Sequence, residues 1–192
     1  MTTTKTHRHR IVLVTCAVLF AGCTSSSDGG GNPPLDESGF GTRYKLADNE
    51  VAGWTQDTAA GSFATYNAET IFNKIDGAAP AYLDRGMRFA LWQQLKGPDP
   101  QNCTLVAMDM TSEANAKSMV AYQQTLPQLA STAIPGYDAS VAIGAEVVGG
   151  IQIYACFKAL YLEVGLDGFG ADSAAASQAG VKFLQAEEGK TK

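Results

Sequence analysis

Histidine is scarce in this chain of 192 residues, and both of its histidines, His7 and His9, lie within the first ten positions. The rest of the chain therefore has no imidazole. This absence excludes Ser-His-Asp and Cys-His catalysis there, and it removes the commonest side-chain ligand of transition metals. We expect no metal site and no cofactor. Any acid–base chemistry would depend on Asp, Glu, Lys or Tyr.

The apolar run at the N-terminus is too short to span a membrane. It covers residues 11–20, whereas a transmembrane helix needs about 20 apolar residues. It follows three cations, Lys5, Arg8 and Arg10, and it leads through small residues to Cys23. A positive start, a short apolar stretch and a small-residue end are typical of an export signal.

The segment that ends at Cys23 resembles a bacterial lipoprotein signal. In such signals the cysteine receives acyl chains such as palmitate and becomes the first residue of the mature protein. We therefore predict a signal peptide over residues 1–22 and lipidation at Cys23. An ordinary cleaved signal peptide and a retained anchor are the alternatives. In a cell with two membranes, a Thr at position 24, directly after the lipidated cysteine, resembles the signal that sorts a lipoprotein to the outer membrane. The protein would be anchored there and face the periplasm.

Cysteine is rare after the signal. The chain has four cysteines, of which Cys16 lies in the signal and Cys23 takes the lipid, so Cys103 and Cys156 are left. No Cys-x-x-Cys pair is present, which excludes the usual redox motif. Since an exported protein meets an oxidising compartment, we expect a Cys103–Cys156 disulfide. Two buried free thiols are the alternative, because cysteine also packs as a small apolar side chain.

A basic patch is missing as well. Without residues 1–22 the chain keeps 11 basic and 19 acidic residues, a formal charge of −8. Such an acidic surface has no electrostatic attraction to nucleic acid or to anionic lipid headgroups. We therefore expect no nucleic-acid partner.

Residues 23–38 are rich in Ser, Gly and Pro and read as a lipidated, flexible tether. The remaining residues, 39–192, have the length and apolar content of a single domain with its own core.

Apolar periodicity predicts the elements of this domain. Helices are expected from Asn67 to residue 75, from Pro80 to Gly86, after Ser112, and after Asp172. Strands are expected at 87–95, 103–110, 141–148, 151–157 and 160–166. The last two strands keep period two in opposite phases, which requires a turn or a bulge near Lys158 and Ala159.

These elements predict an α+β fold, a two-layer sandwich of a mainly antiparallel sheet with helices on one face. The order strand, strand, helix occurs at 87–126 and again at 151–187, which indicates a possible internal duplication.

One segment carries a family resemblance. Ile75, Gly77, Ala79, Tyr82, Leu83 and Gly86 follow a pattern of a short helix ending in Ile-Asn-Gly-Gly-Ala-Glu, then Tyr-Leu, then a glycine before a strand. Asp76, Ala78 and Pro80 depart from it. On these residues the chain resembles, over residues 54–125, an uncharacterised family of exported bacterial proteins that contain a domain of unknown function. The resemblance implies an α+β fold and supplies no reaction.

The glycine-rich break at Asp76, Gly77 and Ala78 is the first candidate ligand site. A break between two helices can expose backbone N–H groups that bind an anion. Asp84 and Arg85 form a charged cluster just after it. The alternatives are a tight turn required for packing and a solvated helix end.

Asp109 and Glu163 lie within apolar strands. If both faced one cleft, they would form a carboxylate pair suited to hydrolysis. Otherwise they face solvent on alternating positions.

We interpret the chain as a lipid-anchored protein of the cell envelope that acts as a non-catalytic binding or interaction module. Its expected partners are the membrane, through the lipid, and an envelope protein or small ligand. The alternative is a carboxylate-dependent hydrolase of an envelope polymer.

Overall fold

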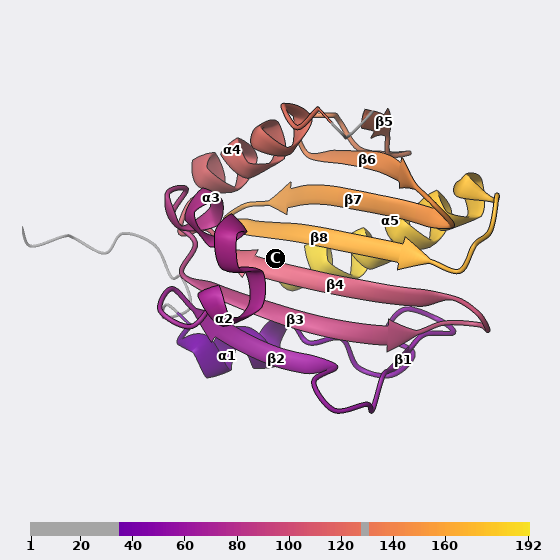
Figure 1. Ribbon diagram of the computed structural model, residues 1–192, viewed down its shortest axis with the longest axis horizontal. Helices are drawn as coiled ribbons and strands as arrows, with labels where there is room; N and C mark the ends of the chain where they lie inside the picture. Colours follow the sequence, from indigo (N-terminus) through magenta and orange to yellow (C-terminus); the bar gives the residue numbers. More distant parts are fainter. Residues whose placement is uncertain (1–34, 128–130) are drawn as a thin grey trace, which may run out of the picture. The chain divides into compact units, whose positions relative to one another are not determined.

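The computed structural model describes residues 35–127 and 131–192. The predicted signal peptide, Cys23 and residues 24–34 of the tether lie outside this part. One sheet dominates the fold, with strand order β1-β3-β4-β8-β7-β6-β5 and with β2 also paired to β3. Neighbouring strands are all antiparallel (Figure 1). The strands are β1 (Thr55–Gln56), β2 (Phe63–Asn67), β3 (Phe89–Lys96), β4 (Asn102–Asp109), β5 (Ser131–Ala133), β6 (Ala142–Val147), β7 (Gly150–Phe157) and β8 (Leu160–Asp167).

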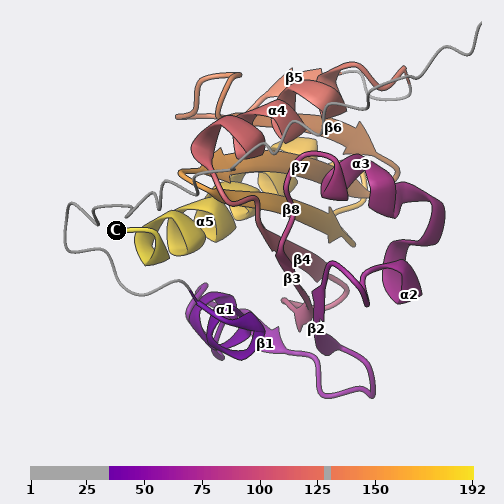
Figure 2. The same ribbon diagram turned by 90° about the vertical axis from the view of Figure 1, so that its left-hand side faces the viewer.

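Helices cover both faces of this sheet. They are α1 (Glu37–Tyr44), α2 (Phe72–Ile75), η1 (Asp76–Ala78), α3 (Ala79–Leu83), α4 (Glu113–Gln124) and α5 (Ser173–Lys190). The helices α1 and α5 pack with one set of strand residues, and α4 packs with the other set, together with residues of the α2–α3 segment. Figure 2 shows α1 and α5 on one side of the sheet and α2 and α3 on the other. We call these sides the α5 face and the α4 face.

The predicted α+β class and the mainly antiparallel sheet are confirmed. The expectation that the helices lie on one face needs correction. Strands β4, β7 and β8 bury alternate side chains on both sides, as in Leu105 and Val106 on β4. A strand that is apolar on both sides requires cover on both faces.

The order strand, strand, helix does occur twice, as β3-β4-α4 and as β7-β8-α5. The two helices lie on opposite faces of the sheet, however. A twofold rotation that exchanges the antiparallel neighbours β4 and β8 has its axis normal to the sheet, and it would keep both helices on one face. The two units are therefore not related by such a rotation, and the structure gives no support to a simple duplication.

The turn predicted near Lys158 is present. β7 ends at Phe157, β8 begins at Leu160, and Lys158 has φ +52°. This two-residue turn lets Phe157 and Leu160 pair in register. The odd positions of β7 and the even positions of β8 therefore share the α5 face, which explains the change of phase in the sequence.

The folded part begins earlier than the sequence indicated. Asp36 caps α1 by accepting a hydrogen bond from the Gly39 N–H, and Phe40 and Tyr44 bury the inner side of this helix. Residues 36–38, which the composition assigns to the tether, are thus the cap and the first turn of α1. Within residues 35–127 and 131–192, no helix combines the length and the apolar character needed to cross a membrane.

Candidate functional site

The α4 face is organised in rows of residues that lie opposite one another on neighbouring strands. Cross-strand pairing aligns Trp92 with Val106, Val106 with Glu163, and Glu163 with Tyr154. We call these four residues the Glu163 row.

Two further rows follow toward the end of the sheet where β3 and β8 finish. The Thr104 row consists of Gln94, Thr104, Gly165 and Gln152. The Asn102 row consists of Lys96, Asn102 and Asp167.

A segment that we call the strap, residues 68–86 with α2, η1 and α3, crosses the α4 face above the Glu163 row (Figure 1). The hydroxyl of Tyr82 on α3 donates to Glu163 Oε1 at 2.7 Å. The Lys74 Nζ on α2 lies 4.5 Å from the centre of the Trp92 ring. In Figure 1 the right-hand part of the sheet, where β3 and β8 end, has no helix in front of it.

Glu163 is the only acidic side chain in its row, and it is well satisfied. The Tyr161 hydroxyl donates to the same oxygen at 3.1 Å, and Tyr161 accepts in turn from the buried Gln123 amide on α4. Burial raises the pKa of the Glu163 carboxyl, and the two tyrosine hydrogen bonds partly offset this effect. Burial and the Glu163 charge raise the pKa of Tyr82, so its hydroxyl keeps its proton and acts as a donor.

The Asn102 row is also satisfied by its own members. Lys96 Nζ donates to Asn102 Oδ1 at 2.7 Å, and Asn102 Nδ2 donates to Asp167 Oδ1 at 2.9 Å. Asp57, just after β1, adds an ion pair with Lys96 at 3.6 Å. This network fixes the rim of the sheet.

The Thr104 row between them differs in its hydrogen bonding. Unlike the Asn102 row, its three polar side chains make no side-chain hydrogen bond within the described residues, and all three reach the surface. Two hollows meet along this row. One, of about 290 Å³, includes Gln94, Thr104 and Asp167; the other, of about 330 Å³, includes Thr104, Gly165, Gln152 and Asp167. Because they share Thr104 and Asp167, we treat them as one groove, the Thr104 groove.

The candidate residues of the strap lie on its outer side. Asp76, Gly77 and Ala78 form η1 and are exposed, and Asp76 has φ +30°. The Ala79 N–H, at the start of α3, already donates to the Asp76 carbonyl, and Pro80 has no N–H. The array of free donors that motivated an anion site is therefore reduced, and a ligand role for this segment stays a prediction.

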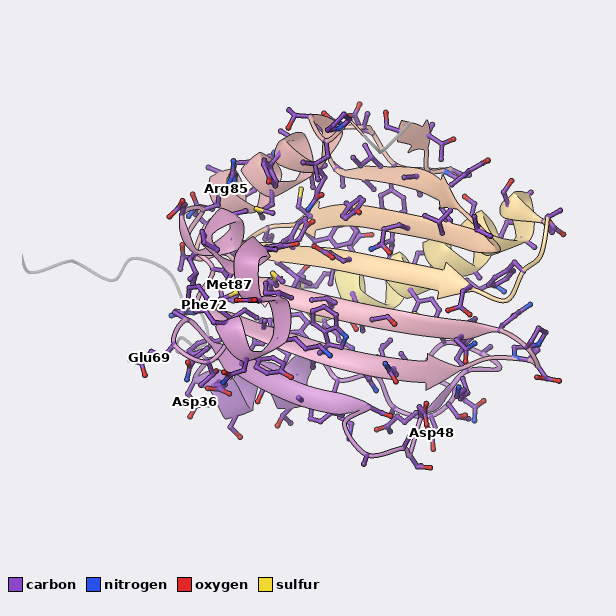
Figure 3. All side chains as sticks on the ribbon, in the orientation of Figure 1. Asp36, Asp48, Glu69, Phe72, Arg85 and Met87 are labelled. Atoms are coloured by element: carbon purple, nitrogen blue, oxygen red, sulfur yellow. The ribbon has the colours of Figure 1, made fainter. Side chains whose placement is uncertain are left out.

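Asp84 and Arg85 do not face the groove either. Asp84 is exposed, while the Arg85 guanidinium lies 4.3 Å from the centre of the Tyr122 ring and donates to the Ala81 carbonyl. Figure 3 places Arg85 and Phe72 at the strap end of the molecule, away from the uncovered part of the sheet. Arg85 therefore serves to join α3 to α4.

The proposed carboxylate pair is not formed. Asp109 lies on the same side of β4 as Leu105, the α5 face, and forms an ion pair with Arg88. Glu163 lies opposite Val106 on the α4 face. Two carboxylates on opposite faces of a sheet cannot share a cleft.

The expected Cys103–Cys156 disulfide is wrong for this fold. Both cysteines are free and buried. Cys103 lies opposite Leu166 in the core of the α5 face, and Cys156 lies opposite Tyr161 on the α4 face. The two positions are two strands and five residues apart, about 19 Å at ordinary sheet spacings, whereas a disulfide needs Cα atoms within about 7 Å. The alternative, two buried thiols, is what the structure shows.

Sequence reasoning did not identify the Thr104 groove. Gln94, Thr104 and Gln152 are polar residues within strands and carry no motif. A usable signal was the alternation of side chains along each strand, which places Gln94, Thr104 and Gln152 on the faces opposite to those of the buried residues Leu95, Leu105 and Ile153. Within residues 35–127 and 131–192, no group of three or more His, Cys, Asp or Glu side chains is placed to hold a metal ion.

The chain is similar to the extracellular domain of PknH from Mycobacterium tuberculosis, with a TM-score of 0.51 and 11% sequence identity, over 84% of this chain and 99% of that one. At this identity the likeness concerns the fold. No family model matches the chain, and no curated protein matches it.

Proposed function

We propose that this protein is a lipid-anchored binding module of the cell envelope, with Cys23 as the lipidated residue and the Thr104 groove as its ligand surface. The observation that carries the proposal is the hydrogen bonding of the α4 face. Glu163 on one side and the Asn102 row on the other are satisfied by protein partners, and the three polar side chains of the Thr104 row between them make no side-chain hydrogen bond within the described residues. In binding sites, a small number of polar groups in a hollow bond to the ligand and fix its orientation.

The N-terminal segment supports the envelope location, since residues 1–23 resemble a lipoprotein signal. The similar fold of the extracellular domain of PknH is compatible with an exported module. The separation of Asp109 from Glu163 gives no support to a hydrolase, so we favour binding without catalysis.

Photocrosslinking in the source cell tests this function. A photoreactive amino acid at Thr104 or Gln152 is expected to yield an adduct with an envelope component. Gln56, which lies on β1 and lines a different hollow beside α1, is the matched control position. Adducts that form equally at Gln56, or no adduct from either groove position, would refute the proposal.

A further inference from the structure

The chemical character of the Thr104 groove points to the class of its ligand. Its row offers two primary amides and one hydroxyl, and each of these groups provides both donors and acceptors. None carries a charge. A ligand that matches them needs groups that also donate and accept without charge, and hydroxyl groups do both.

The surrounding charges narrow the class further. Asp57 and Asp167 line the groove, the cation Lys96 there is already paired with Asp57 and Asn102, and the next cation, Lys74, lies over the Trp92 ring of the neighbouring row. Net negative charge at the groove disfavours phosphates, nucleic acid and acidic polymers.

The shape of the row suits an extended ligand. Gln94, Thr104, Gly165 and Gln152 lie on four adjacent strands, so the row is about 14 Å long at ordinary strand spacing. Gly165 has no side chain, and this leaves room for the Gln152 amide beside it, since a Cβ on Gly165 would come within 2.7 Å of the Gln152 Oε1. Trp92, in the next row, has the Lys74 ammonium over its ring and stays partly exposed beside the floor of the groove.

We propose that the Thr104 groove binds a neutral oligosaccharide or polysaccharide chain, laid across β3, β4, β8 and β7. Hydroxyl groups of the sugar bond to Gln94, Thr104 and Gln152, and the apolar face of a ring packs near Trp92. An extended peptide is disfavoured, because peptides that add to sheets use a free strand edge, whereas this groove crosses the face of paired strands. This inference rests on the proposed function and specifies its ligand.

Calorimetric titration tests it. The protein used is the mature chain with Cys23→Ser, which carries no lipid. It is titrated with four neutral hexasaccharides, of the maltose, cellulose, mannan and chitin series. At least one is expected to bind, and acidic oligogalacturonate is expected to bind more weakly. Thr104→Val and Gln152→Met should each reduce affinity about three- to tenfold, as expected for the loss of one net hydrogen bond.

Two substitutions on the α5 side of the sheet, Gln56→Met on β1 and Thr132→Val on β5, serve as controls and should leave the affinity unchanged. Near-UV circular dichroism confirms that each variant is folded. Failure of all four neutral sugars to bind, or affinities that the groove variants do not change, would overturn the inference. A crosslinked protein at Thr104 would overturn it too while leaving the binding function intact.

Discussion

The Tyr82 hydroxyl donates to Glu163 Oε1 at 2.7 Å, and this contact joins the strap to the centre of the sheet across 81 positions of sequence. Tyr82 comes from a five-residue helix that has little stability of its own. Glu163 comes from a strand paired on both sides. The hydrogen bond therefore fixes the strap at the border of the Thr104 groove.

Tyr82→Phe is expected to loosen the strap. It removes one donor from a largely buried carboxylate, and we expect a loss of about 1–3 kcal/mol in the free energy of unfolding. Amide hydrogen exchange over residues 72–86 should accelerate more than exchange in β4 and β8. Tyr66→Phe is the control, since Tyr66 is half-buried on β2 and no side-chain hydrogen bond to its hydroxyl is seen in the described residues. Equal exchange in the two variants would show that the contact does not hold the strap.

Glu187 makes stability depend on pH near neutrality. This α5 residue is fully buried, and burial raises its pKa from 4.5 to about 7, although the Lys190 ammonium at 3.2 Å lowers it. Glu50, which shares Lys190, and Tyr44 also face it. The folded state thus binds the proton more tightly than the unfolded chain. Stability should fall as pH rises from about 4.5 to 7, by on the order of 3 kcal/mol for this group.

Glu187→Gln should flatten this pH dependence, because an amide does not titrate. Thermal melts at pH 5 and pH 8 give the comparison. Glu163 contributes in the same direction through its raised pKa, so part of the slope should persist in the variant. A wild-type protein that is more stable at pH 8 than at pH 5 would contradict the assignment of Glu187.

Two glycines provide a matched test of packing. A Cβ on Gly150, at the start of β7, would lie 1.7 Å from the Leu166 carbonyl oxygen, which is backbone and cannot move aside cheaply. A Cβ added to Gly189, near the end of α5, would have no atom within 4 Å. Gly150→Ala should destabilise the fold by about 1–3 kcal/mol or more, and Gly189→Ala should be neutral or slightly stabilising. Chemical denaturation that ranks them in the opposite order would refute the pairing of β7 with β8 at this end.

The two cysteines should be present as unreactive thiols. Burial raises the pKa of Cys103 well above its ordinary value and raises that of Cys156 to about 11. Intact mass after alkylation without reductant should show no modification at Cys103 or Cys156 in the native domain, and two modified thiols after denaturation. An unmodified pair in the denatured, unreduced sample would instead reveal a disulfide and a different strand order.

Periodicity located most of this fold because its strands and long helices bury regular faces. The sequence places the starts of two helices after Ser112 and after Asp172, and both residues do cap these helices by accepting from the N–H three positions on. α1 was missed because its sequence, with two glycines, has weak helix propensity and gains its stability from packing Phe40 and Tyr44 against the sheet. β1 and β5 have only two and three residues, too few for a pattern.

The site was less predictable than the fold. The pairing of Cys103 with Cys156 was expected because they are the two cysteines left in an exported chain, but the strand order and the face on which each residue lies decide which side chains meet. Asp109 and Glu163 are apart for the same reason, because they lie on opposite faces of the sheet. The Thr104 groove depends on pairing between residues 94, 104, 165 and 152, and no local pattern in one sequence encodes that alignment.

Occupancy of the Thr104 groove in the cell is the most direct test of the central claim. A cysteine is introduced by Thr104→Cys or, as control, by Gln56→Cys, and its labelling by a membrane-impermeant thiol reagent is compared between the native envelope and the purified protein. The wild type, with buried Cys103 and Cys156, gives the background. The account predicts that position 104 is protected in the envelope while position 56 labels equally in both settings. Equal labelling of position 104 in the envelope and in solution would contradict it.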